Sequence, residues 1–595
     1  MKKLNDIAIL HKLLGTDPTK KEDVQPKEAL SYSFAGLGQN IICQLVTTFF
    51  MMYMTDVAGV SALWLSWMFL AARLFDAFND PIMGSIVEMT RSKYGKMRPY
   101  LKYSPIPIAI FTVLLFVSFG DAVSQVGQFI YSTVIYLCWG IAYTSVDVPY
   151  WGLASSMTSD TDKRNTLLTV ARLFCTIGGG IVSVVIPIIG LDKMTVSEQK
   201  LAYIIVAVIC VAMAVPTFFI GFKNTKERFY DDSSEGKFSL KENLKLLGKN
   251  TPALLIILIG VLGSLRTIYM TTTLYYAKYN LRNFGLAAVI FLLVVPGGLI
   301  ATLLTPYLSK KFSKKTVFFW SHIIGGALMV ILYFIGLSSN GTNLASQISF
   351  YIIIILAGIP TGFSNIMTYS MIADSIDYLE DKTGERAEGI CFSLQTFISK
   401  IGMAMTAFVT LMVLGEYGYN AELAQTAVTD EVYFSAEFQK ICEGNWMATT
   451  LLCGLSMFAC AIPLLFYTFT EERQNEAVSR VLARKIVAGN TDPTVRHEFV
   501  LAVNAIDRVK RSEILVGIAE IFGLKTIEEL DAKVEELKVV DEVLAEDEVL
   551  AHVDSVDEVA EKLGVDEISE IADDYTFDAE KEEKKSDDNT GDDNK

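Results

Sequence analysis

Long apolar stretches recur along the chain from about residue 30 to residue 470, and many exceed the ~20 residues that a helix needs to cross hydrocarbon. Twelve such stretches lie near residues 31–56, 61–89, 101–120, 125–157, 167–190, 201–222, 252–277, 284–308, 317–338, 346–376, 389–415 and 445–470. Several contain Gly or Pro, which membrane helices tolerate better than soluble helices do. The pattern predicts an all-α polytopic membrane protein with 12 transmembrane helices.

A charged stretch at residues 223–250 divides these spans six and six. The stretch from Tyr150 to Arg164 resembles the stretch from Tyr369 to Arg386, which suggests two related halves. Two parallel six-helix pseudo-repeats with a site between them are typical of the major facilitator fold. The expected parts are an N-terminal segment (1–30), an N-terminal bundle (31–222), a linker (223–250), a C-terminal bundle (251–470) and a tail (471–595).

The charge is distributed unevenly between the membrane body and the tail. The whole chain has a net charge of −16, but residues 471–595 hold 35 acidic and 16 basic side chains, a net of −19. The remainder is slightly basic, and nothing in this balance indicates nucleic-acid binding. We therefore expect an acidic cytoplasmic tail that is partly helical and disordered at its end. Whether it has a cytoplasmic partner is left open.

Lys and Arg in the short loops predict the orientation of the spans. Loops 90–100 and 309–316 carry four basic residues each, whereas the loops near 57–61, 121–124 and 339–345 carry none. Because basic loops remain on the cytoplasmic side, both termini are expected there, in a multi-pass protein of the plasma membrane. In the same loops and at the ends of neighbouring spans, charged residues are candidates for a cytoplasmic gate between the halves: Arg91, Lys96, Arg98, Asp374, Asp377 and Arg386.

The second span contains polar residues where lipid-facing sequence would be apolar. Arg73, Asp76, Asn79 and Asp80 fall on one helical arc of about 120°. An ionised Asp at mid-membrane costs at least ~2.5 kcal/mol, so it needs a partner or a wet cavity. Two carboxylates one turn apart, with an amide beside them, predict a site for Na⁺ or a shared proton. A purely structural Arg73–Asp76 pair is the alternative, although it leaves the second carboxylate unexplained.

Further polar residues within the apolar spans suit a hydroxylated substrate and a coupling device. Thr144, Asp147 and Trp151 share a face of the fourth span, where the carboxylate suits sugar hydroxyls and the indole a pyranose ring. Arg172 in the fifth span can satisfy Asp147 or donate to the substrate, and a structural ion pair is about as plausible. Lys400 stands alone in the eleventh span and needs a carboxylate across the interface.

That carboxylate is expected to be Asp76 or Asp80, so that Lys400 competes with a cation for the acidic site. A lysine that reaches out to the membrane surface is the alternative. The sequence contains no Walker lysine motif, which argues against an ATP-driven pump. We expect no catalytic residues and no cofactor, only Na⁺ or H⁺ as a coupling ion.

Several motifs resemble the glycoside–pentoside–hexuronide:cation symporters, the family of melibiose permease. They cover roughly residues 28–472 in matching order: Arg73-Leu-Phe-Asp-Ala-Phe-Asn-Asp-Pro-Ile-Met-Gly84, Thr90-Arg-Ser-Lys-Tyr-Gly-Lys-Met-Arg-Pro99, Tyr143-Thr-Ser-Val-Asp-Val-Pro-Tyr-Trp151, Ala373-Asp-Ser-Ile-Asp-Tyr378 and Gln395-Thr-Phe-Ile-Ser-Lys400. The resemblance implies that Asp76 and Asp80 bind the cation, with Asn79 and Thr144 as supporting ligands. It also implies that Asp147, Trp151 and Arg172 bind sugar, with Thr396 and Lys400 at the sugar–cation junction.

Two expected sugar-site positions depart from the family member, since Asn40 replaces an Asp and Asn365 replaces a Trp. These changes leave the cation site intact but put an α-galactoside substrate in doubt. The expected function is a secondary symporter that imports a glycoside, pentoside or hexuronide with Na⁺ or H⁺ by alternating access. The alternatives are a membrane sugar sensor or scaffold that signals through its tail, and a carrier of another amphiphilic solute.

Overall fold

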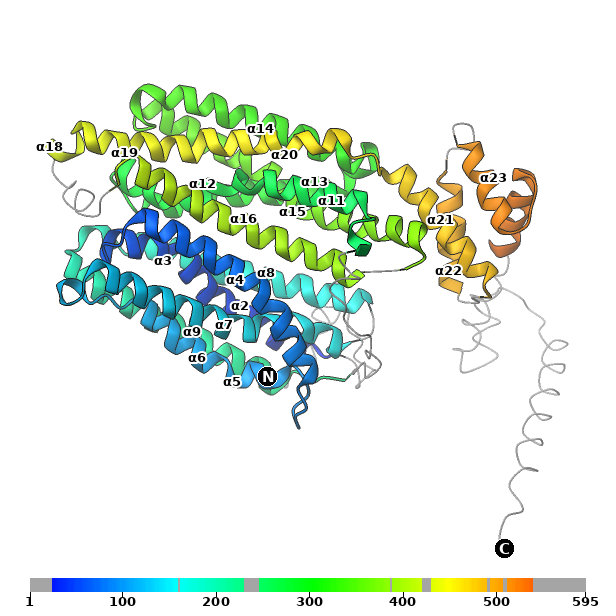
Figure 1. Cartoon of the computed structure of the whole chain (residues 1–595), viewed down its shortest axis with the longest axis horizontal. Helices are drawn as coiled ribbons and strands as arrows, with labels where there is room; N and C mark the ends of the chain where they lie inside the picture. Colours follow the sequence, from blue (N-terminus) through cyan, green and yellow to red (C-terminus); the bar gives the residue numbers. More distant parts are fainter. Residues whose placement is uncertain are drawn as a thin grey trace, which may run out of the picture. The chain divides into compact units, whose positions relative to one another are not determined.

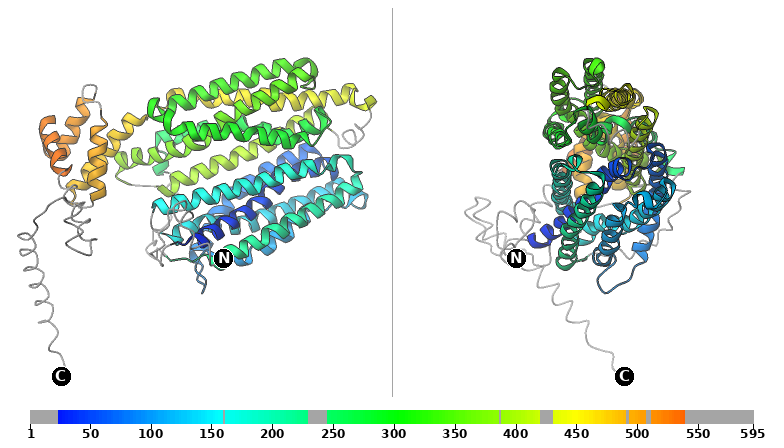
Figure 2. Two further views of the ribbon diagram at one scale, coloured as in Figure 1. Left: turned by 180° about the vertical axis from the view of Figure 1, so that it is seen from behind. Right: turned by 90° about the vertical axis from the view of Figure 1, so that its left-hand side faces the viewer.

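The computed structural model describes residues 24–158, 161–228, 245–385, 388–419, 430–489, 493–506 and 511–538, and these residues form helices joined by turns and loops. They divide into two compact units, the first made of Met1–Leu379 with Arg386–Thr470 and the second of Glu380–Glu385 with Glu471–Lys595. In the first unit, the helices of residues 26–224 gather in one bundle and those of residues 251–466 in another beside it (Figures 1 and 2).

The N-terminal bundle begins with one continuous rod that changes its helical type along its length. This rod consists of α2 (Pro26–Gln44), η2 (Leu45–Phe49), α3 (Phe50–Met52) and η3 (Tyr53–Val57). The remaining helices are α4 (Ala62–Met89), α5 (Arg98–Tyr103), α6 (Pro105–Leu115), α7 (Gln125–Met157), α8 (Thr161–Ile188) and α9 (Val196–Asn224). Small residues let α2 approach α8, because a Cβ on Gly178 would lie 2.3 Å from the Leu37 carbonyl oxygen.

The C-terminal bundle also begins with an interrupted rod. Helix α11 (Thr251–Leu262) is followed by η6 (Ser264–Thr267), α12 (Ile268–Tyr275) and η7 (Tyr276–Asn280), and the rod bends by 48°. The remaining helices are α13 (Leu286–Lys311), α14 (Lys314–Gly336), α15 (Leu344–Thr383), α16 (Glu388–Glu416), α18 (Asp430–Tyr433), α19 (Ala436–Met447), η9 (Ala448–Leu452) and α20 (Cys453–Phe466).

Among the described residues, nine helices are long and apolar enough to cross a membrane, and the bent pair at residues 251–280 makes ten. The expected second span, α4, is absent from this group, and it is the helix that carries Arg73, Asp76 and Asp80. The expected third span contains only the shorter apolar helix Pro105–Leu115. An all-helical, polytopic membrane protein is therefore confirmed, whereas the count of 12 stays a prediction.

The second unit has a hydrophobic core of its own. It contains α21 (Glu471–Val487), α22 (Pro493–Asn504), α23 (Ser512–Ile521) and a further helical stretch at residues 527–538. Leu530, Val534 and Leu537 are buried in this core together with Phe499 and Ile518. The apolar repeat near residue 530 therefore packs into a small helical bundle. The end of the tail, expected to be disordered, lies outside the described residues.

Basic residues of α21 hold the last residues of α15 within this second unit. Arg480 makes a bidentate contact with Asp381, from Nε to Oδ1 at 3.2 Å and from Nη2 to Oδ2 at 2.6 Å, and Lys485 lies 2.7 Å from Glu380. Arg484 adds a contact of 3.1 Å to Asp381. Two parts of the chain about a hundred residues apart are thus joined by charge-assisted hydrogen bonds.

Candidate functional site

The charged face of α4 begins with an ion pair inside the helix itself. The Arg73 guanidinium donates to the Asp76 carboxylate at 3.2 Å, one turn along the helix. Asp76 is 9 % exposed, and a Cβ on Gly140 of α7 would lie 3.2 Å from its Oδ1 atom. The carboxylate is thus neutralised by its own helix and lies close to the backbone of α7.

The second carboxylate of α4 joins the two bundles. Asp80 forms an ion pair with Lys400 of α16 and accepts a 3.3 Å hydrogen bond from the Thr144 hydroxyl of α7. Of the two carboxylates considered for Lys400, the structure thus places the lysine on Asp80. Side chains of three helices meet at this point, where the buried Asp76 and the partly buried Asp80 are each paired with a base.

Asn79 lies between the two carboxylates in sequence, and its amide nitrogen can still donate hydrogen bonds. Its Nδ2 atom is buried and has no hydrogen-bond partner among the residues that the structure describes. Buried polar atoms without a partner are uncommon in native proteins and mark places where a ligand or water can bind. The amide therefore fits a role beside the acidic pair.

The polar group on α7 lies next to this site and is held by the first helix. Asp147 accepts hydrogen bonds from the Gln39 amide of α2 and from the Trp151 indole, the latter at 3.1 Å. Gln39 also donates to the Tyr143 hydroxyl at 3.3 Å. Gln39 escaped the sequence analysis because an amide inside a helix gives little signal. It fixes the rotamer of the carboxylate expected to bind sugar.

Arg172 of α8 contacts aromatic rings of both bundles. Its guanidinium lies over the Trp151 ring at 4.9 Å and over the Tyr369 ring of α15 at 6.0 Å. Arg172 and Tyr369 are both exposed, so this guanidinium contacts rings of both bundles and remains accessible. Cation–π contacts of this kind hold a guanidinium in place while leaving its N–H groups able to donate.

The remaining predicted substrate residues lie on helices of both bundles. Asn40 of α2 donates to the Gly36 carbonyl of its own helix at 3.4 Å. Asn365 is an exposed residue of α15, four residues before Tyr369. The backbone of Thr396 belongs to α16, but its side chain lies outside the described residues.

Gly95 and Glu227 fix the basic loop after α4 within its own bundle. The carboxylate of Glu227 accepts hydrogen bonds of 2.7 to 2.9 Å from the backbone N–H groups of Lys96, Met97 and Arg98. Gly95 adopts φ +105°, and a Cβ there would lie 2.4 to 2.5 Å from the same carboxylate. Only glycine fits this position, both in backbone conformation and in space.

Two of the predicted gate residues make contacts within their own bundles. Arg98 donates to the Phe222 carbonyl at 2.8 Å, and Asp374 lies 2.6 Å from Lys314. Three other predicted gate residues also interact with other groups: Arg91, Lys96 and Asp377. Arg386 lies outside the described residues. A gate between the bundles at these residues stays a prediction.

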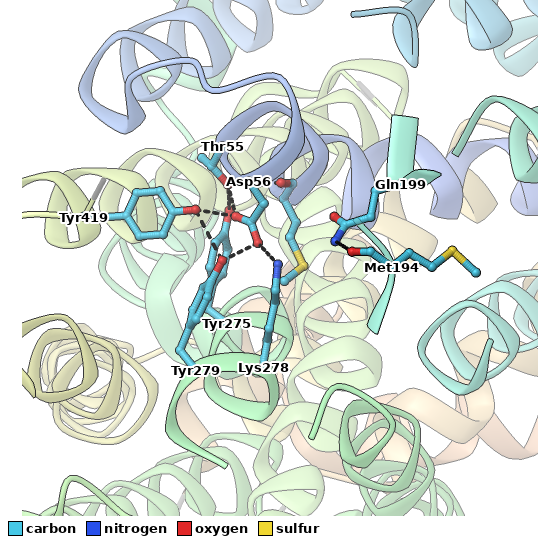
Figure 3. Close-up of polar contacts among 9 residues, drawn as sticks. Thr55, Asp56, Met194, Gln199, Tyr275, Lys278, Tyr279 and Tyr419 are labelled. Atoms are coloured by element: carbon cyan, nitrogen blue, oxygen red, sulfur yellow. Dashed lines mark hydrogen bonds and ion pairs between the residues drawn. The ribbon is translucent and has the colours of Figure 1, made fainter. Parts of the chain in front are cut away.

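A second charged network, which the sequence analysis missed, joins the bundles at the other end of α4 (Figure 3). Asp56 of η3 is 2 % exposed and lies 2.5 Å from the Lys278 ammonium of η7. Its carboxylate also accepts hydrogen bonds from the hydroxyls of Thr55, Tyr279 and Tyr419. Since Asp56 precedes α4 and the basic loop follows it, the two lie at opposite ends of that helix.

The sequence gives only a weak signal for this network. Asp56 and Lys278 stand at the predicted ends of the first and seventh spans, where charged residues usually face water. In the structure Tyr275 closes the group, with its hydroxyl 3.0 Å from that of Thr55. The cluster shields one carboxylate with four hydroxyl-bearing side chains from both bundles.

Comparisons with known proteins agree with this architecture. Residues 31–471 match the family described as "MFS/sugar transport protein". The chain is 32% identical over 450 residues to the isoprimeverose transporter of Lactiplantibacillus pentosus, which covers 75% of this chain and 89% of that protein. It is 28% identical over 471 residues to the glucuronide carrier protein homolog of Escherichia coli, covering 77% of this chain and 96% of that protein.

The fold is shared with solved transporter structures. The crystal structure of nucleoside transporter NupG superposes with a TM-score of 0.51 at 14% identity, over 74% of this chain and 98% of that one. At this identity the similarity concerns the fold alone. The chain belongs to the MFS/sugar transport protein family, the glycoside–pentoside–hexuronide type of sugar symporter that its motifs resemble, and is a transporter rather than an enzyme.

Proposed function

We propose that the protein imports a glycoside, pentoside or hexuronide together with Na⁺ or H⁺ by alternating access. The observation that carries the proposal is the Asp80–Lys400 ion pair, which spans the two bundles beside the Asp76–Arg73 pair. In this state each of the two carboxylates is already neutralised. A cation that binds to Asp76 and Asp80 must therefore displace the Lys400 ammonium, or a proton must take its place.

That exchange can link ion binding to conformation. Burying a charge without a partner is expensive, so Lys400 must find water or another acceptor when a cation takes Asp80. Because Lys400 belongs to the C-terminal bundle and Asp80 to the N-terminal bundle, the exchange removes a contact between the two. Asn79 and Thr144 are the supporting ligands that we assign to Na⁺.

The neighbouring polar group suits a sugar. A carboxylate held by Gln39 and Trp151 offers acceptors for vicinal hydroxyls, and the indole offers a flat apolar surface. Arg172 supplies N–H donors that suit hydroxyls or the carboxylate of a hexuronide. The relatives named for isoprimeverose and for glucuronides fit the same two substrate classes. We assign Asn40, Asn365 and Thr396 to the periphery of this site.

The same proposal includes the membrane topology. We assign 12 spans in two pseudo-repeats, both termini in the cytoplasm and residence in the plasma membrane. The basic loops at 90–100 and 309–316 support this orientation through the positive-inside rule. The Asp56–Lys278 network then lies at the outer end of the pathway and closes it in this state.

The test is uptake of labelled glycosides, pentosides and hexuronides into liposomes that contain the full-length protein. We expect accumulation against a gradient that needs an inward Na⁺ or H⁺ gradient, and its loss in Asp80→Asn. Glu198→Gln is the matched control, because this carboxylate caps the start of α9 on the exposed surface. Sugar binding without movement under any gradient would overturn the proposal in favour of a sensor.

A further inference from the structure

One buried hydroxyl near the acidic pair has no hydrogen-bond partner and no role in the function proposed above. Tyr136 of α7 is 3 % exposed, and its Oη atom has no partner among the residues that the structure describes. Native proteins rarely leave a buried hydroxyl unpaired, because the lost hydration is costly. A partner that arrives in another state of the protein accounts for such an atom.

The ring that carries this hydroxyl is held on three sides. It stacks on Phe50 of α3 with 5.5 Å between the ring centroids, and on Trp139 of its own helix at 5.9 Å. Phe69 of α4 meets the ring edge-on at 5.3 Å. Because these aromatic contacts fix the ring, the hydroxyl cannot turn away to an acceptor elsewhere in the bundle.

Tyr136 begins a stripe of α7 that follows the charged face of α4. Gly140 lies one turn later, and a Cβ there would lie 3.2 Å from the Oδ1 atom of Asp76. Thr144 lies a further turn along and donates to Asp80 at 3.3 Å. Steps of four residues keep to one face of a helix. Tyr136 therefore shares the face of α7 that is turned towards the acidic pair.

Arg73 lies within electrostatic range of this hydroxyl, as do Asp76 and the Cys43 thiol of α2. Within the described part of the chain the guanidinium makes a single hydrogen bond, of 3.2 Å to Asp76, so most of its N–H donors are unused. To reach Asp76 the side chain extends towards the C-terminal end of α4, although helical side chains lean towards the N-terminal end. Tyr136, which contacts Phe69, lies on that N-terminal side.

In a step that rests on the cation site proposed above, we propose that Tyr136 is a positioning residue whose hydroxyl accepts the Arg73 guanidinium when Na⁺ takes Asp76. Arg73 then loses its carboxylate, and a guanidinium inside the membrane needs another acceptor. The phenolic oxygen offers lone pairs, whereas the Cys43 thiol is a weak acceptor. Tyr136 thus raises the affinity for the ion without touching it, because it stabilises the displaced base.

The test is Na⁺ binding by the full-length protein in detergent, measured from the rise of its unfolding temperature as NaCl replaces choline chloride. In Tyr136→Phe we expect Na⁺ to bind about tenfold to a hundredfold more weakly, which is the worth of a hydrogen bond to a charged group. Without Na⁺ the variant should unfold no earlier than the unchanged protein, because the hydroxyl makes no hydrogen bond in this state. Phenylalanine keeps the ring and its aromatic contacts.

Tyr53→Phe is the matched control, since it removes another buried hydroxyl from the same bundle. This hydroxyl donates to the Phe116 carbonyl at 2.8 Å. The control should unfold earlier without Na⁺, yet keep its Na⁺ affinity within about twofold of the unchanged protein. The same behaviour in Tyr136→Phe would show a merely structural hydroxyl and would overturn the proposal.

Arg73→Gln distinguishes an acceptor for Arg73 from a ligand of the ion. In that background the hydroxyl has no guanidinium to receive, so adding Tyr136→Phe should change the Na⁺ affinity by less than about twofold. A further loss of about tenfold would make Tyr136 a direct ligand and overturn the proposal. Unchanged Na⁺ affinity in Tyr136→Phe would also overturn it, as would the absence of any Na⁺ response in the unchanged protein.

Sugar uptake into liposomes tests the symporter separately. Accumulation driven by protons in a protein that does not bind Na⁺ would leave the proposed function standing and overturn this inference. Failure of all uptake beside the expected Na⁺ affinities in Tyr136→Phe, Tyr53→Phe and Arg73→Gln would do the reverse, because those affinities are measured without sugar.

Discussion

Asp56→Asn removes the negative charge from the network that joins the two bundles at one end, and it should release that end. Lys278 would then lie against a neutral amide, and the Tyr279 and Tyr419 hydroxyls would lose a charged acceptor. The change keeps the size of the side chain, so the packing of η3 is preserved.

The magnitude follows from the burial of the pair. Asp56 is 2 % exposed, and breaking a buried ion pair by removing one partner costs about 3–5 kcal/mol. When this end opens, water reaches both groups, and an exposed pair contributes only about 0–1 kcal/mol. The closed state should therefore lose about 3 kcal/mol relative to the open state, and the ratio of the two populations should change by roughly 150-fold.

Double electron–electron resonance can measure this shift. Spin labels at Ser61→Cys and Asn283→Cys would report the separation of the two bundles, because these positions lie in the turns beside η3 and η7. Six of the eight cysteines are buried, and the partly buried Cys43 and Cys138 can be replaced by serine. We expect a second, longer distance in Asp56→Asn, and a similar one in Lys278→Gln.

Tyr53→Phe is the control for an unspecific loss of packing. Its buried hydroxyl donates to the Phe116 carbonyl at 2.8 Å, entirely within the N-terminal bundle. It should leave the distance distribution unchanged. A distribution in Asp56→Asn that matches the unchanged protein, or an equal shift in Tyr53→Phe, would refute the reasoning.

Three further changes have defined outcomes. Lys400→Gln leaves Asp80 without its base, so Na⁺ should bind about tenfold more tightly in calorimetry while gradient-driven uptake is lost; unchanged Na⁺ affinity would contradict the competition. Gly95→Ala forces a Cβ against the Glu227 carboxylate at positive φ, and thermal unfolding should show about 1–3 kcal/mol of destabilisation, with Gly384→Ala, where the space is open, as a milder control. Arg480→Ala removes the bidentate contact with Asp381, so amide exchange in α21 should accelerate about fivefold to tenfold, whereas Lys533→Ala, on an exposed pair, should change little.

Part of the site could be predicted from the sequence, because burying an unpaired charge in a membrane is costly. A lysine and two aspartates inside apolar spans must find one another or water, so the cost of burying charge favoured the pairing of Lys400 with an acid of α4. The sequence left open whether Lys400 pairs with Asp80 or Asp76. In the structure Arg73 pairs with Asp76 within the same helix, which leaves Asp80 for Lys400. Sequence spacing shows which residues share a face of a helix, but it does not show which neighbouring charge each of them pairs with.

The misses have physical causes as well. The sequence left Arg172 open as a partner of Asp147 or as a donor to the substrate. In the structure Gln39 and Trp151 hydrogen-bond to this carboxylate, and an uncharged amide in a helix carries no energetic cost that would have revealed Gln39. Asp56 stands at the end of a predicted span, where a charged residue is ordinary. Its role in joining the bundles depends on Lys278, which lies 222 residues later in the sequence. In the tail, the apolar repeat of residues 527–537 is compatible with a coiled coil or a bundle, and only tertiary contacts distinguish them.

Under the proposed symport, the two charged networks give a reason why one ligand alone should not open the end that Asp56 closes. Asp56–Lys278 and Asp80–Lys400 each join a carboxylate of the N-terminal bundle to a lysine of the C-terminal bundle, at different depths of the same interface. A ligand that binds only the open state, present at ten times its Kd, stabilises that state by about 1.4 kcal/mol. Cation and sugar together give about 2.8 kcal/mol, close to the roughly 3 kcal/mol by which the buried Asp56 pair favours closure. Either ligand alone offsets only half of that amount, so under the proposed symport the strength of this pair would set how strictly sugar and cation are transported together. Weakening it with Asp56→Asn should let sugar cross without its ion.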